Sequence, residues 1–473
     1  MTQIRRTKIV ATVGPACRAP GMLDKLIAAG VDVFRVNMSH ASVEDLEHWL
    51  RAAREASSRA GRSVGVLADL QGPRLRTGPL VDHAPVLLQN GSTFEITTEP
   101  VQGTSARVST AYAALPKDVK PGDRILLSDG SIELSVRKTT PTSVVCDVVH
   151  GGWLREHAGM NLPGVAVSSP SLTDKDRADL AHAVRLQVDF IALSFVRSEQ
   201  DVADAKAAIA AAGGDVPVVA KIEKPEAIEH LDAILRATDV VMVARGDLGV
   251  EMPPEKVPTL QKLIIRQAAA HLVPVITATQ MLESMVHSPR PTRAEASDVA
   301  NAIMDGTDAT MLSEETAAGE FPVEAVATMV RIALEAEAHS PLYALRSPRV
   351  SNDSHAISHA ACTIAESIDV RAIAAFTRSG FSARIVSKDR PCVPIYAFVP
   401  DEAVARRLAL DHGVQTCIMD FARTTDELLA AVEAELLERK AVDPGEAVVV
   451  VGGTPMGVRG RTNFLKIIRA GAA

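Results

Sequence analysis

The chain has 473 residues, of which 47% are hydrophobic and 23% charged, and its net charge of −8 and pI near 5.9 make it mildly acidic. Such a composition is typical of a globular protein and argues against a nucleic-acid-binding protein, which would carry a basic surface. No apolar run approaches the roughly 18 residues of a membrane span. We therefore expect a cytoplasmic protein of roughly two to four domains, with no nucleic-acid or membrane partner.

The N-terminal sequence MTQIRRTKIVATVGP contains two arginines, but its apolar run is short and ends at Gly14-Pro15, so we expect no signal peptide. The five cysteines are scattered along the chain, and none forms the CxxC pattern of a zinc or redox site. We expect them to be reduced thiols, as is usual in cytosolic proteins. They are Cys17, Cys146, Cys362, Cys392 and Cys417.

Eight short β-branched runs alternate with helical patterns, which predicts βαβ units and a parallel sheet. Most of these runs are apolar throughout and end in polar residues. Eight such strands predict an α/β fold of the (β/α)8 TIM-barrel type, whose active site lies at the carboxyl ends of the strands. The runs lie at residues 7–14, 31–39, 63–71, 189–196, 216–223, 239–247, 273–280 and 309–316.

The regular spacing is interrupted between the third and fourth runs. Residues 86–98 (VLLQNGSTFEITT) and 124–138 (RILLSDGSIELSVRK) alternate around Asn-Gly and Asp-Gly, a pattern that predicts β-hairpins. We expect residues 74–170 to form a small inserted β-barrel domain, which leaves 1–73 and 171–342 for the barrel. Asp129 is interpreted as a turn residue in preference to a nucleotide contact.

A second α/β pattern follows a long helical stretch at residues 322–340 and a linker rich in proline and serine. We expect residues 343–473 to form a separate, doubly wound C-terminal α/β domain. Its strands are predicted at residues 371–377, 393–399, 414–420 and 447–453.

The fifth barrel strand, in VVAKIEKPEA, ends in two charged residues that project to the same face, Lys221 and Glu223. Charged residues are seldom buried unless they are paired or functional. Asp247 ends the next strand, so two carboxylates of neighbouring strands could hold Mg²⁺. The alternatives are a plain Lys221–Glu223 ion pair and a helix N-cap at Asp247.

Other strand ends contribute polar side chains to the same rim. After the second strand, Arg35, Asn37 and Ser39 share one face, which suits a phosphate or a cation, although a salt-bridged strand end is equally compatible. Thr277 and Thr279 share a face of the seventh strand, but threonine is also a common strand former. The remaining candidates are Asp69, Arg74 and Arg76 after the third strand and Ser313 and Glu315 after the eighth.

Five segments resemble the pyruvate kinase family: TKIVATVGP, FRVNMSH, VVAKIEKPEAI, MVARGDLGVE and ATQMLESMVHSPRPTRAEASDVANAIMDGTDATMLSEETAAGEFP. The order of barrel, inserted β domain and C-terminal α/β domain is also similar, and the resemblance covers nearly the whole chain. It implies transfer of the phosphoryl group of phosphoenolpyruvate to ADP, giving ATP and pyruvate in glycolysis. It also implies Mg²⁺ or Mn²⁺ as cofactor and a homotetramer.

The resemblance assigns a role to each of several rim residues. Lys221 matches the active-site lysine, and Glu223 and Asp247 match the Mg²⁺ ligands. Arg35 matches an arginine that binds phosphate, and Arg76 one that contacts nucleotide phosphates. Thr279 and Ser313 match the family's hydroxyls near the side where the enolate is protonated. The backbone N–H groups of Gly246 and Asp247 would bind the substrate carboxylate. Asn37 and His40 are placed among the substrate- and nucleotide-binding residues.

The chain departs from the common family pattern around the K⁺ position. Many members hold K⁺ at positions matching Asn37, Ser39, Asp69 and the carbonyl of residue 70, and read DTKGPE where this chain reads DLQGPR. Arg74 replaces the glutamate, and its permanent charge can stand in for K⁺. We expect that K⁺ is not required, although Thr77 matches the K⁺-dependent branch.

Two further sites follow from the resemblance. A turn rich in hydroxyls and glycine before a C-terminal helix suits an anion, and in similar proteins it binds an allosteric sugar phosphate; the alternative is a plain helix cap. Its residues are Thr377, Ser379, Gly380 and Ser382. In the inserted domain Ala158 stands where a lysine is usual, so His157 or Arg155 would take its nucleotide contact.

Two other functions compete with this interpretation. One is another Mg²⁺-dependent barrel enzyme with enolpyruvate chemistry, such as a lyase or a phosphomutase. The other is a non-catalytic regulatory paralogue that binds a sugar phosphate. The additional domains argue against the first, and the presence of Lys221, Glu223 and Asp247 argues against the second.

Overall fold

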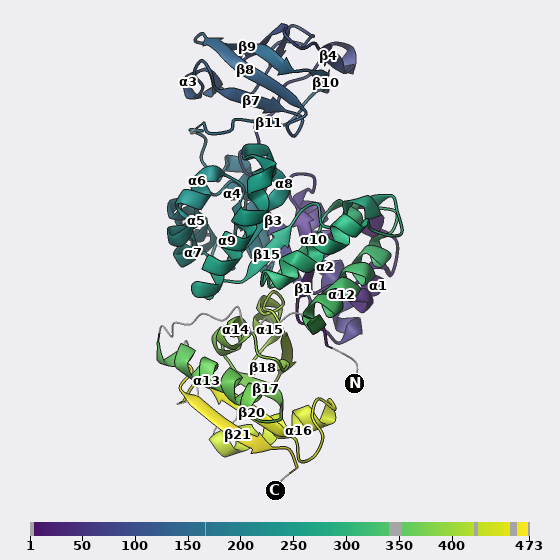
Figure 1. Ribbon diagram of the computed structural model, residues 1–473, viewed down its shortest axis with the longest axis vertical. Coiled ribbons are helices and arrows are strands. Elements are labelled where there is room, and N and C mark those ends of the chain that lie inside the picture. The colour runs from purple at the N-terminus through teal and green to yellow at the C-terminus, as the bar shows by residue number, and fades with distance from the viewer. Residues whose placement is uncertain (1–3, 166, 340–351, 421–423, 455–460, 472–473) are drawn as a thin grey trace.

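The computed structural model describes residues 4–165, 167–339, 352–420, 424–454 and 461–471. Three parts follow one another along the long axis of the molecule: the inserted β domain, the barrel and the C-terminal domain (Figure 1). The predicted linker after residue 340, and with it the expected boundary at residue 343, lies outside the described residues.

The central part is a closed barrel of eight strands, in which every neighbouring pair is parallel and the order is β1-β16-β15-β14-β13-β12-β3-β2. Each strand lies within one of the eight predicted runs, so the predicted barrel is confirmed. The strands are β1 Lys8–Thr12, β2 Val33–Asn37, β3 Gly65–Asp69, β12 Phe190–Leu193, β13 Val218–Ile222, β14 Val240–Ala244, β15 Val275–Ala278 and β16 Ala309–Leu312.

Helices surround the barrel, and one apolar core fills its interior while a second lies between strands and helices. Three of the longer helices begin with a capping box at Ser42, Thr173 and Thr292, which satisfies backbone N–H groups at the helix start. The helices are α1 Met22–Ala29, α2 Val43–Ala60, α4 Asp174–Arg185, α5 Glu199–Ala211, α6 Pro225–Glu229, α7 Leu231–Ala237, α8 Arg245–Glu251, α9 Val257–Ala270, α10 Arg293–Met304, α11 Glu314–Ala317 and α12 Pro322–His339.

An aspartate precedes every second strand of the barrel and ties it to a neighbouring strand. Asp32, Asp189, Asp239 and Asp308 each accept a hydrogen bond from a backbone N–H of the adjacent strand, at 2.7 to 2.9 Å. A carboxylate accepts such bonds more strongly than a neutral group does. These four residues therefore close the amino-terminal end of the barrel, opposite the end where the polar strand termini lie.

The inserted domain is a curled β domain with a six-stranded sheet of order β11-β7-β8-β9-β5-β6 and a two-stranded sheet of β10 and β4. The predicted hairpin at Asp129-Gly130 is confirmed, because β7 pairs antiparallel with β8. Its elements are β4 Val86–Leu88, β5 Thr93–Thr97, β6 Arg107–Ser109, α3 Leu115–Asp118, β7 Arg124–Leu127, β8 Ile132–Thr139, β9 Ser143–His150, β10 Gly152–Leu154 and β11 Met160–Asn161.

The predicted hairpin at Asn90-Gly91 is wrong. The turn exists, but β4 pairs with β10 whereas β5 pairs with β9 and β6. The Asn90 side chain accepts a hydrogen bond from the backbone N–H of Gly151, which ties the turn to the chain just before β10. A connection that joins two different sheets replaces the expected hairpin.

The C-terminal domain has a five-stranded sheet of order β19-β18-β17-β20-β21 with an apolar core on each face. The four predicted strands are present, and β21 is an additional antiparallel edge strand. The elements are α13 Asp353–Ser367, β17 Val370–Phe376, α14 Phe381–Lys388, β18 Ile395–Val399, α15 Glu402–Arg407, β19 Val414–Ile418, α16 Thr425–Glu438, β20 Ala447–Gly452 and β21 Phe464–Arg469.

The C-terminal domain contacts the amino-terminal end of the barrel through buried ion pairs. Lys388 and Arg390, at the end of α14, both pair with Asp308, which precedes β16. Arg406 of α15 pairs with Asp189 in the same way. Two of the four aspartates that tie the strands together, Asp189 and Asp308, thus also anchor the C-terminal domain.

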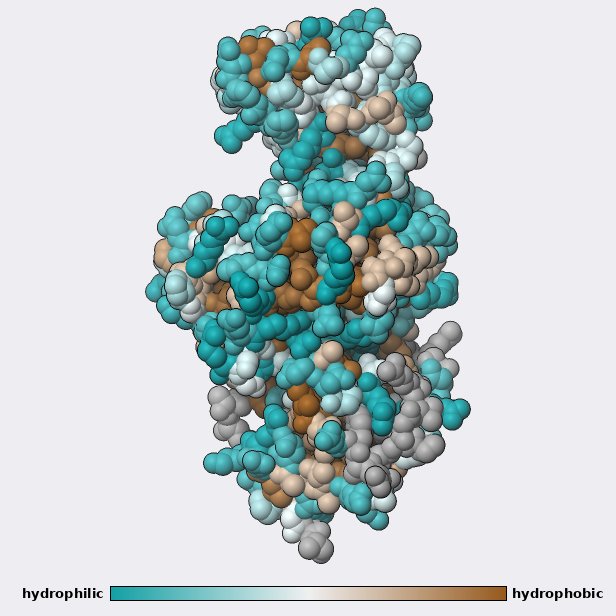
Figure 2. All heavy atoms as spheres, turned by 180° about the vertical axis from the view of Figure 1, so that it is seen from behind, coloured by the Kyte–Doolittle hydropathy of each residue, from teal (hydrophilic) through white to brown (hydrophobic). Residues whose placement is uncertain are grey.

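No helix among the described residues is long and apolar enough to cross a membrane. Seen from behind, hydrophobic residues gather over the middle of the molecule, where the barrel lies, and hydrophilic residues surround them (Figure 2).

Candidate active site

The polar strand ends meet around a cavity of about 190 Å³ at the carboxyl-terminal rim of the barrel. Its walls come from the ends of β2, β3, β12, β13, β14, β15 and β16, as the barrel fold predicts. The polar residues that line it are Arg35, Asn37, Ser39, Arg74, Ser194, Lys221, Glu223, Asp247, Thr279 and Ser313.

Lys221 is the centre of this site. Its side chain is 10% exposed, and its Nζ lies 2.8 Å from Glu223 Oε1, 2.9 Å from Ser194 Oγ and 3.4 Å from Asp69 Oδ1. Burial would lower the pKa of Lys221, but the carboxylates of Asp69 and Glu223 raise it above its usual value. The lysine is therefore a buried ammonium that faces the cavity.

Asp69 links the lysine to Arg35. Its Oδ2 accepts a hydrogen bond from Arg35 Nε at 2.7 Å, and the Arg35 Nη1 donates to Thr12 Oγ1 at 3.0 Å. Burial would raise the pKa of Asp69, but Lys221 and Arg35 hold it below the usual range. Asp69 Oδ1 is buried without a hydrogen-bond partner among the described residues. Asp69 thus holds the two cations Lys221 and Arg35 side by side at the cavity.

Glu223 and Asp247 both line the cavity, and no third carboxylate, histidine or cysteine joins them in a metal-binding group among the described residues. Burial raises the pKa of Glu223, and the charge of Asp247 raises it further, although Lys221 opposes the shift. Two carboxylates that repel each other are stabilised by a cation between them. The donor set fits Mg²⁺, which usually takes one or two protein carboxylates and completes its shell with water and substrate oxygens.

Thr279 and Gly246 form the part of the rim opposite Arg35. The backbone N–H of Gly246 donates to Thr279 Oγ1 at 2.7 Å, and that hydroxyl donates to the Ala278 carbonyl. Thr279 has a φ of +68°, so the chain leaves the extended conformation directly after β15. The Thr279 side chain lines the cavity.

Thr277 does not share the position of Thr279, contrary to the alternation expected from the sequence. It is fully buried, and its hydroxyl bonds Thr307 Oγ1 at 2.9 Å. Glu315 is also structural, because its carboxylate accepts the backbone N–H groups of Leu282 and Ser313. Ser313 itself lines the cavity, and its buried Oγ has no hydrogen-bond partner among the described residues.

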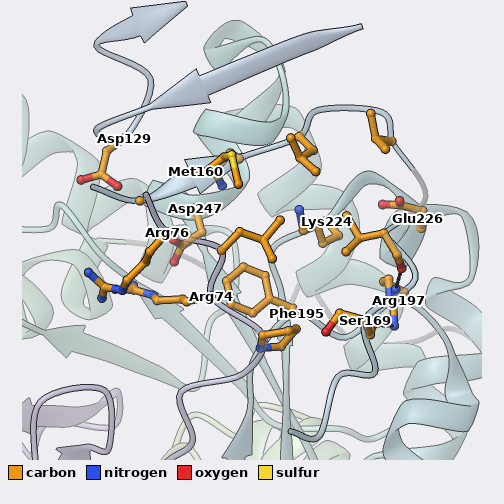
Figure 3. Close-up of a pocket in the computed structure, with 17 residues that line it drawn as sticks. Arg74, Arg76, Asp129, Met160, Ser169, Phe195, Arg197, Lys224, Glu226 and Asp247 are labelled. Carbon is orange, nitrogen blue, oxygen red and sulfur yellow. Dashed lines mark hydrogen bonds between the residues drawn. The ribbon is translucent and has the colours of Figure 1, made fainter. Parts of the chain in front are cut away.

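A second cavity of about 140 Å³ lies between the barrel and the inserted domain and adjoins the first at Arg74 and Asp247. Figure 3 shows Arg76 and Asp129 beside Asp247 at one end of it, and Lys224, Glu226 and Arg197 at the other. Arg76 donates to the His157 carbonyl at 3.1 Å. The cleft therefore has both domains as walls, and a lid over it is geometrically possible.

The remaining predicted residues of this region have mixed outcomes. Asp129 lies in the predicted turn, with a φ of +53°, but it also lines the cleft. Arg155 and His157 are exposed, and Ala158 packs against the core of the inserted domain. His40 lies largely exposed on the rim. The part of its side chain that is buried, together with the positive charges of Arg74 and Arg76, lowers its pKa.

Sequence reasoning missed Ser194 and Phe195, which follow β12 and contact the Lys221–Glu223 pair. The sequence did contain a signal for Ser194, which is a polar residue at the end of the fourth predicted strand. The prediction considered the polar ends of other strands and left this one out. It also missed the cleft residues Arg197, Lys224 and Glu226.

The predicted effector turn precedes α14, and Gly380 caps the helix with a φ of +88°. Ser379 is exposed, whereas Ser382 is buried and bonds Thr462 Oγ1 at 2.7 Å. The adjoining cavity of about 450 Å³ is lined by Phe381, Arg461, Thr462 and residues at the start of α13. The turn therefore borders a cavity, but Ser382 already has a structural partner.

The fold and the site together define a (β/α)8-barrel enzyme for an anionic substrate: an ammonium, two guanidinium groups and two carboxylates line one cavity, which suits the transfer of a phosphoryl group. Comparison with known families agrees. The family model "Pyruvate kinase, barrel domain" matches residues 4–326, and "Pyruvate kinase, alpha/beta domain" matches residues 355–468.

Individual relatives agree over the full length. A pyruvate kinase of Corynebacterium glutamicum is 46% identical, with 98% of this chain and 97% of that protein covered. A pyruvate kinase of Mycobacterium tuberculosis is 45% identical, with 99% of both covered. The crystal structure of a pyruvate kinase from Cryptosporidium parvum matches with a TM-score of 0.93 and 36% identity, over 98% of this chain and 96% of that one.

The chain belongs to the pyruvate kinase family. It is a phosphotransferase of glycolysis, which transfers the phosphoryl group of phosphoenolpyruvate to ADP and yields ATP and pyruvate. The lyase or phosphomutase and the non-catalytic paralogue are thereby excluded.

Proposed function

We propose that the reaction takes place in the rim cavity, with Lys221 as the residue that stabilises the migrating phosphoryl group and the enolate oxygen. The observation that supports this most is the contact of Lys221 Nζ with Glu223 Oε1 at 2.8 Å in a cavity that Arg35 and Asp247 also line. Phosphoryl transfer depends on positioning and charge neutralisation more than on covalent catalysis. A coupled assay for pyruvate from phosphoenolpyruvate, ADP and Mg²⁺ measures the activity on which the variants below are compared.

The other rim residues take roles that their positions suit. Arg35 and Arg76 bind phosphate groups, and Asn37 and His40 lie beside them on the substrate and nucleotide side. The backbone N–H groups of Gly246 and Asp247 donate to the substrate carboxylate, which replaces Thr279 Oγ1 as the acceptor of the Gly246 N–H. Thr279 and Ser313 deliver the proton to the enolate; the unpartnered Oγ of Ser313 supports this, because it can bond a water or a substrate atom.

Glu223 and Asp247 would hold Mg²⁺ (or Mn²⁺), which neutralises charge on phosphoryl and carboxylate oxygens when bound. Glu223→Gln is expected to raise the Mg²⁺ concentration for half-maximal activity at least about tenfold, because loss of even an outer partner costs that much metal affinity. Titration of activity with Mg²⁺ measures this shift. The control is Glu226→Gln, a cleft carboxylate three residues away that does not line the rim cavity; an unshifted titration for Glu223→Gln would contradict the assignment.

K⁺ is not required, because Arg74 supplies the positive charge at the K⁺ position. Arg74 lines the same cavity as Asn37, Ser39 and Leu70. Activity with tetramethylammonium as the only monovalent cation is expected to stay within about twofold of that with KCl, since a guanidinium is permanently charged. Arg74→Glu is expected to become dependent on KCl. Strong activation of the unmodified enzyme by KCl would show that Asn37, Ser39 and Asp69 hold the ion.

The regulatory and assembly roles rest on the family. The turn with Thr377, Ser379, Gly380 and Ser382 receives an anionic effector such as a sugar phosphate, which its position beside a cavity with Arg461 supports. An identical saturation curve for phosphoenolpyruvate with and without a panel of sugar phosphates would contradict this. A homotetramer is supported by the hydrophobic residues over the back of the barrel (Figure 2), and a solution mass near 50.1 kDa would contradict it.

We infer domain limits at residues 73/74 and 170/171, which the separate apolar cores of the barrel and the inserted domain support. The inserted domain acts as a lid over the nucleotide, and its position above the cleft supports that role (Figure 1).

A further inference from the structure

Ser194 occupies a position between two parts of the active site. It directly follows β12 and is 2% exposed. Its hydroxyl donates a hydrogen bond to the Leu70 carbonyl at 2.8 Å and accepts one from Lys221 Nζ at 2.9 Å. Because a hydroxyl has one proton, the bond to Leu70 directs a lone pair towards the lysine.

The next residue fixes the other member of the ion pair. The backbone N–H of Phe195 donates to Glu223 Oε2 at 2.8 Å, and Phe195 has a φ of +57°. A bulky residue in this region of backbone conformation is strained, so surrounding contacts must hold it there. Gly72 leaves room for this arrangement, because a Cβ at Gly72 would lie 2.7 Å from the Phe195 ring and 2.9 Å from Ser194 Cβ.

These contacts determine the direction of the ammonium group. Lys221 Nζ lies 2.9 Å from Ser194 Oγ and 2.8 Å from Glu223 Oε1, and it forms a longer ion pair with Asp69 Oδ1 at 3.4 Å. Two short hydrogen bonds on an ammonium restrict the direction of its third N–H by tetrahedral geometry. Without Ser194, only carboxylates would hold Lys221, and they would attract it away from an anionic substrate.

We propose that Ser194 is a positioning residue for phosphoryl transfer: its hydroxyl, oriented by the Leu70 carbonyl, holds the ammonium of Lys221 in the direction of the substrate. The proposal rests on the role of Lys221 proposed above and adds to it a residue that acts through the lysine. It also gives the loop after β3 a part in catalysis through its backbone.

Ser194→Ala is expected to lower kcat about 10- to 100-fold, because misplacement of a catalytic group by about 1 Å has an effect of that size. The KM for phosphoenolpyruvate is expected to change less than about threefold, since Arg35 and the metal ligands remain. Exchange of the C3 protons of pyruvate in D₂O, followed by NMR, is expected to slow in parallel, because the enolate oxygen also depends on Lys221. A purely structural role would instead raise KM and lower the melting temperature at an unchanged kcat.

A second pair of variants separates the hydroxyl from side-chain size. Threonine and valine have the same shape, so Ser194→Thr is expected to be at least about tenfold more active than Ser194→Val if the hydroxyl matters. If the threonine and valine variants are both inactive, the kcat of Ser194→Ala relative to the unmodified enzyme decides whether the hydroxyl matters. Ser387→Ala is the matched control, because Ser387 is a fully buried serine of α14 in the C-terminal domain that bonds the His412 carbonyl at 2.7 Å, and the kcat of this variant is expected to be unchanged.

The outcomes distinguish this proposal from the one on which it rests. Normal turnover of Lys221→Met would overturn the role of the lysine, and that of Ser194 with it. An inactive Lys221→Met together with normal kcat and proton exchange in Ser194→Ala would overturn the role of Ser194 alone. Equal and measurable activity of Ser194→Thr and Ser194→Val would also overturn the role of Ser194 alone.

Discussion

Lys221→Met is expected to reduce ATP formation by roughly a hundred- to thousandfold or more, which corresponds to the loss of about 3–4 kcal/mol of transition-state stabilisation by one preorganised donor. Methionine has nearly the length of lysine but no charge. The negative charge of the migrating phosphoryl group and of the enolate would then lack its only ammonium in the rim cavity among the described residues. Steady-state assays of pyruvate formation measure the effect.

The fold and the binding of phosphoenolpyruvate are expected to change little in this variant. Asp69 keeps its bond to Arg35 at 2.7 Å, and Glu223 keeps the Phe195 N–H at 2.8 Å. Isothermal titration with phosphoenolpyruvate and Mg²⁺ tests the binding, and circular dichroism tests the fold. Lys206→Met is the matched control, because Lys206 pairs with Asp239 at the opposite end of the barrel. Near-normal turnover of Lys221→Met would refute the assignment.

Asp308→Asn is expected to lower the free energy of unfolding by about 3–5 kcal/mol, because it removes a buried negative charge that pairs with two buried cations. Lys388 and Arg390 are 2% and 4% exposed, and both pair with Asp308, which is fully buried. Asparagine can still accept the backbone N–H of Val275, so the strand contact is retained. The expected loss is therefore electrostatic and centred on the junction between barrel and C-terminal domain.

The effect of Asp308→Asn is expected to depend on pH. Burial lowers the pKa of Lys388 to about 8 although Asp308 raises it, so without Asp308 the folded-state pKa falls further. The folded variant then releases this proton at a lower pH, while the unfolded chain still binds it. The free energy of unfolding of the variant therefore rises with pH above the lowered pKa of its Lys388. The difference in the free energy of unfolding between the variant and the unmodified protein is expected to narrow as pH approaches about 8.

Urea unfolding followed by circular dichroism measures the stability, and hydrogen–deuterium exchange of peptides from α14 and β16 tests its location. Asp239→Asn is the matched control, because Asp239 bonds a strand N–H at 2.9 Å in the same manner but pairs with Lys206, whose side chain is 41% exposed. Its loss is expected to be about 1 kcal/mol. Equal effects of the two substitutions would show that the C-terminal contacts add nothing.

Local patterns predicted much of the fold. The eight apolar runs were identified correctly because strand formation depends on side-chain type and spacing within a few residues. The turn at Asp129-Gly130 was predicted for the same reason, whereas that at Asn90-Gly91 was not a hairpin, because β4 and β5 find their partners in different sheets. Pairing between strands distant in sequence has no local signal.

Alternation also failed where the strands end. Lys221 and Glu223 do lie on one face, and their side chains meet at 2.8 Å. Thr277 and Thr279 do not, because Thr279 takes a φ of +68° and the alternation of side chains stops at Ala278. The alternation of side chains applies to extended backbone and no longer applies one residue beyond the end of the strand.

By itself the sequence determined that polar residues gather at one rim of the barrel, because parallel strands of a closed barrel must end at the same edge and polar residues end most of them. Only the tertiary structure decided how these residues act on one another. The hydroxyl of Ser194 between Leu70 and Lys221, and the Phe195 N–H on Glu223, arise where β3, β12 and β13 lie side by side. Distances and bond directions of this kind depend on packing between segments that are far apart in the chain.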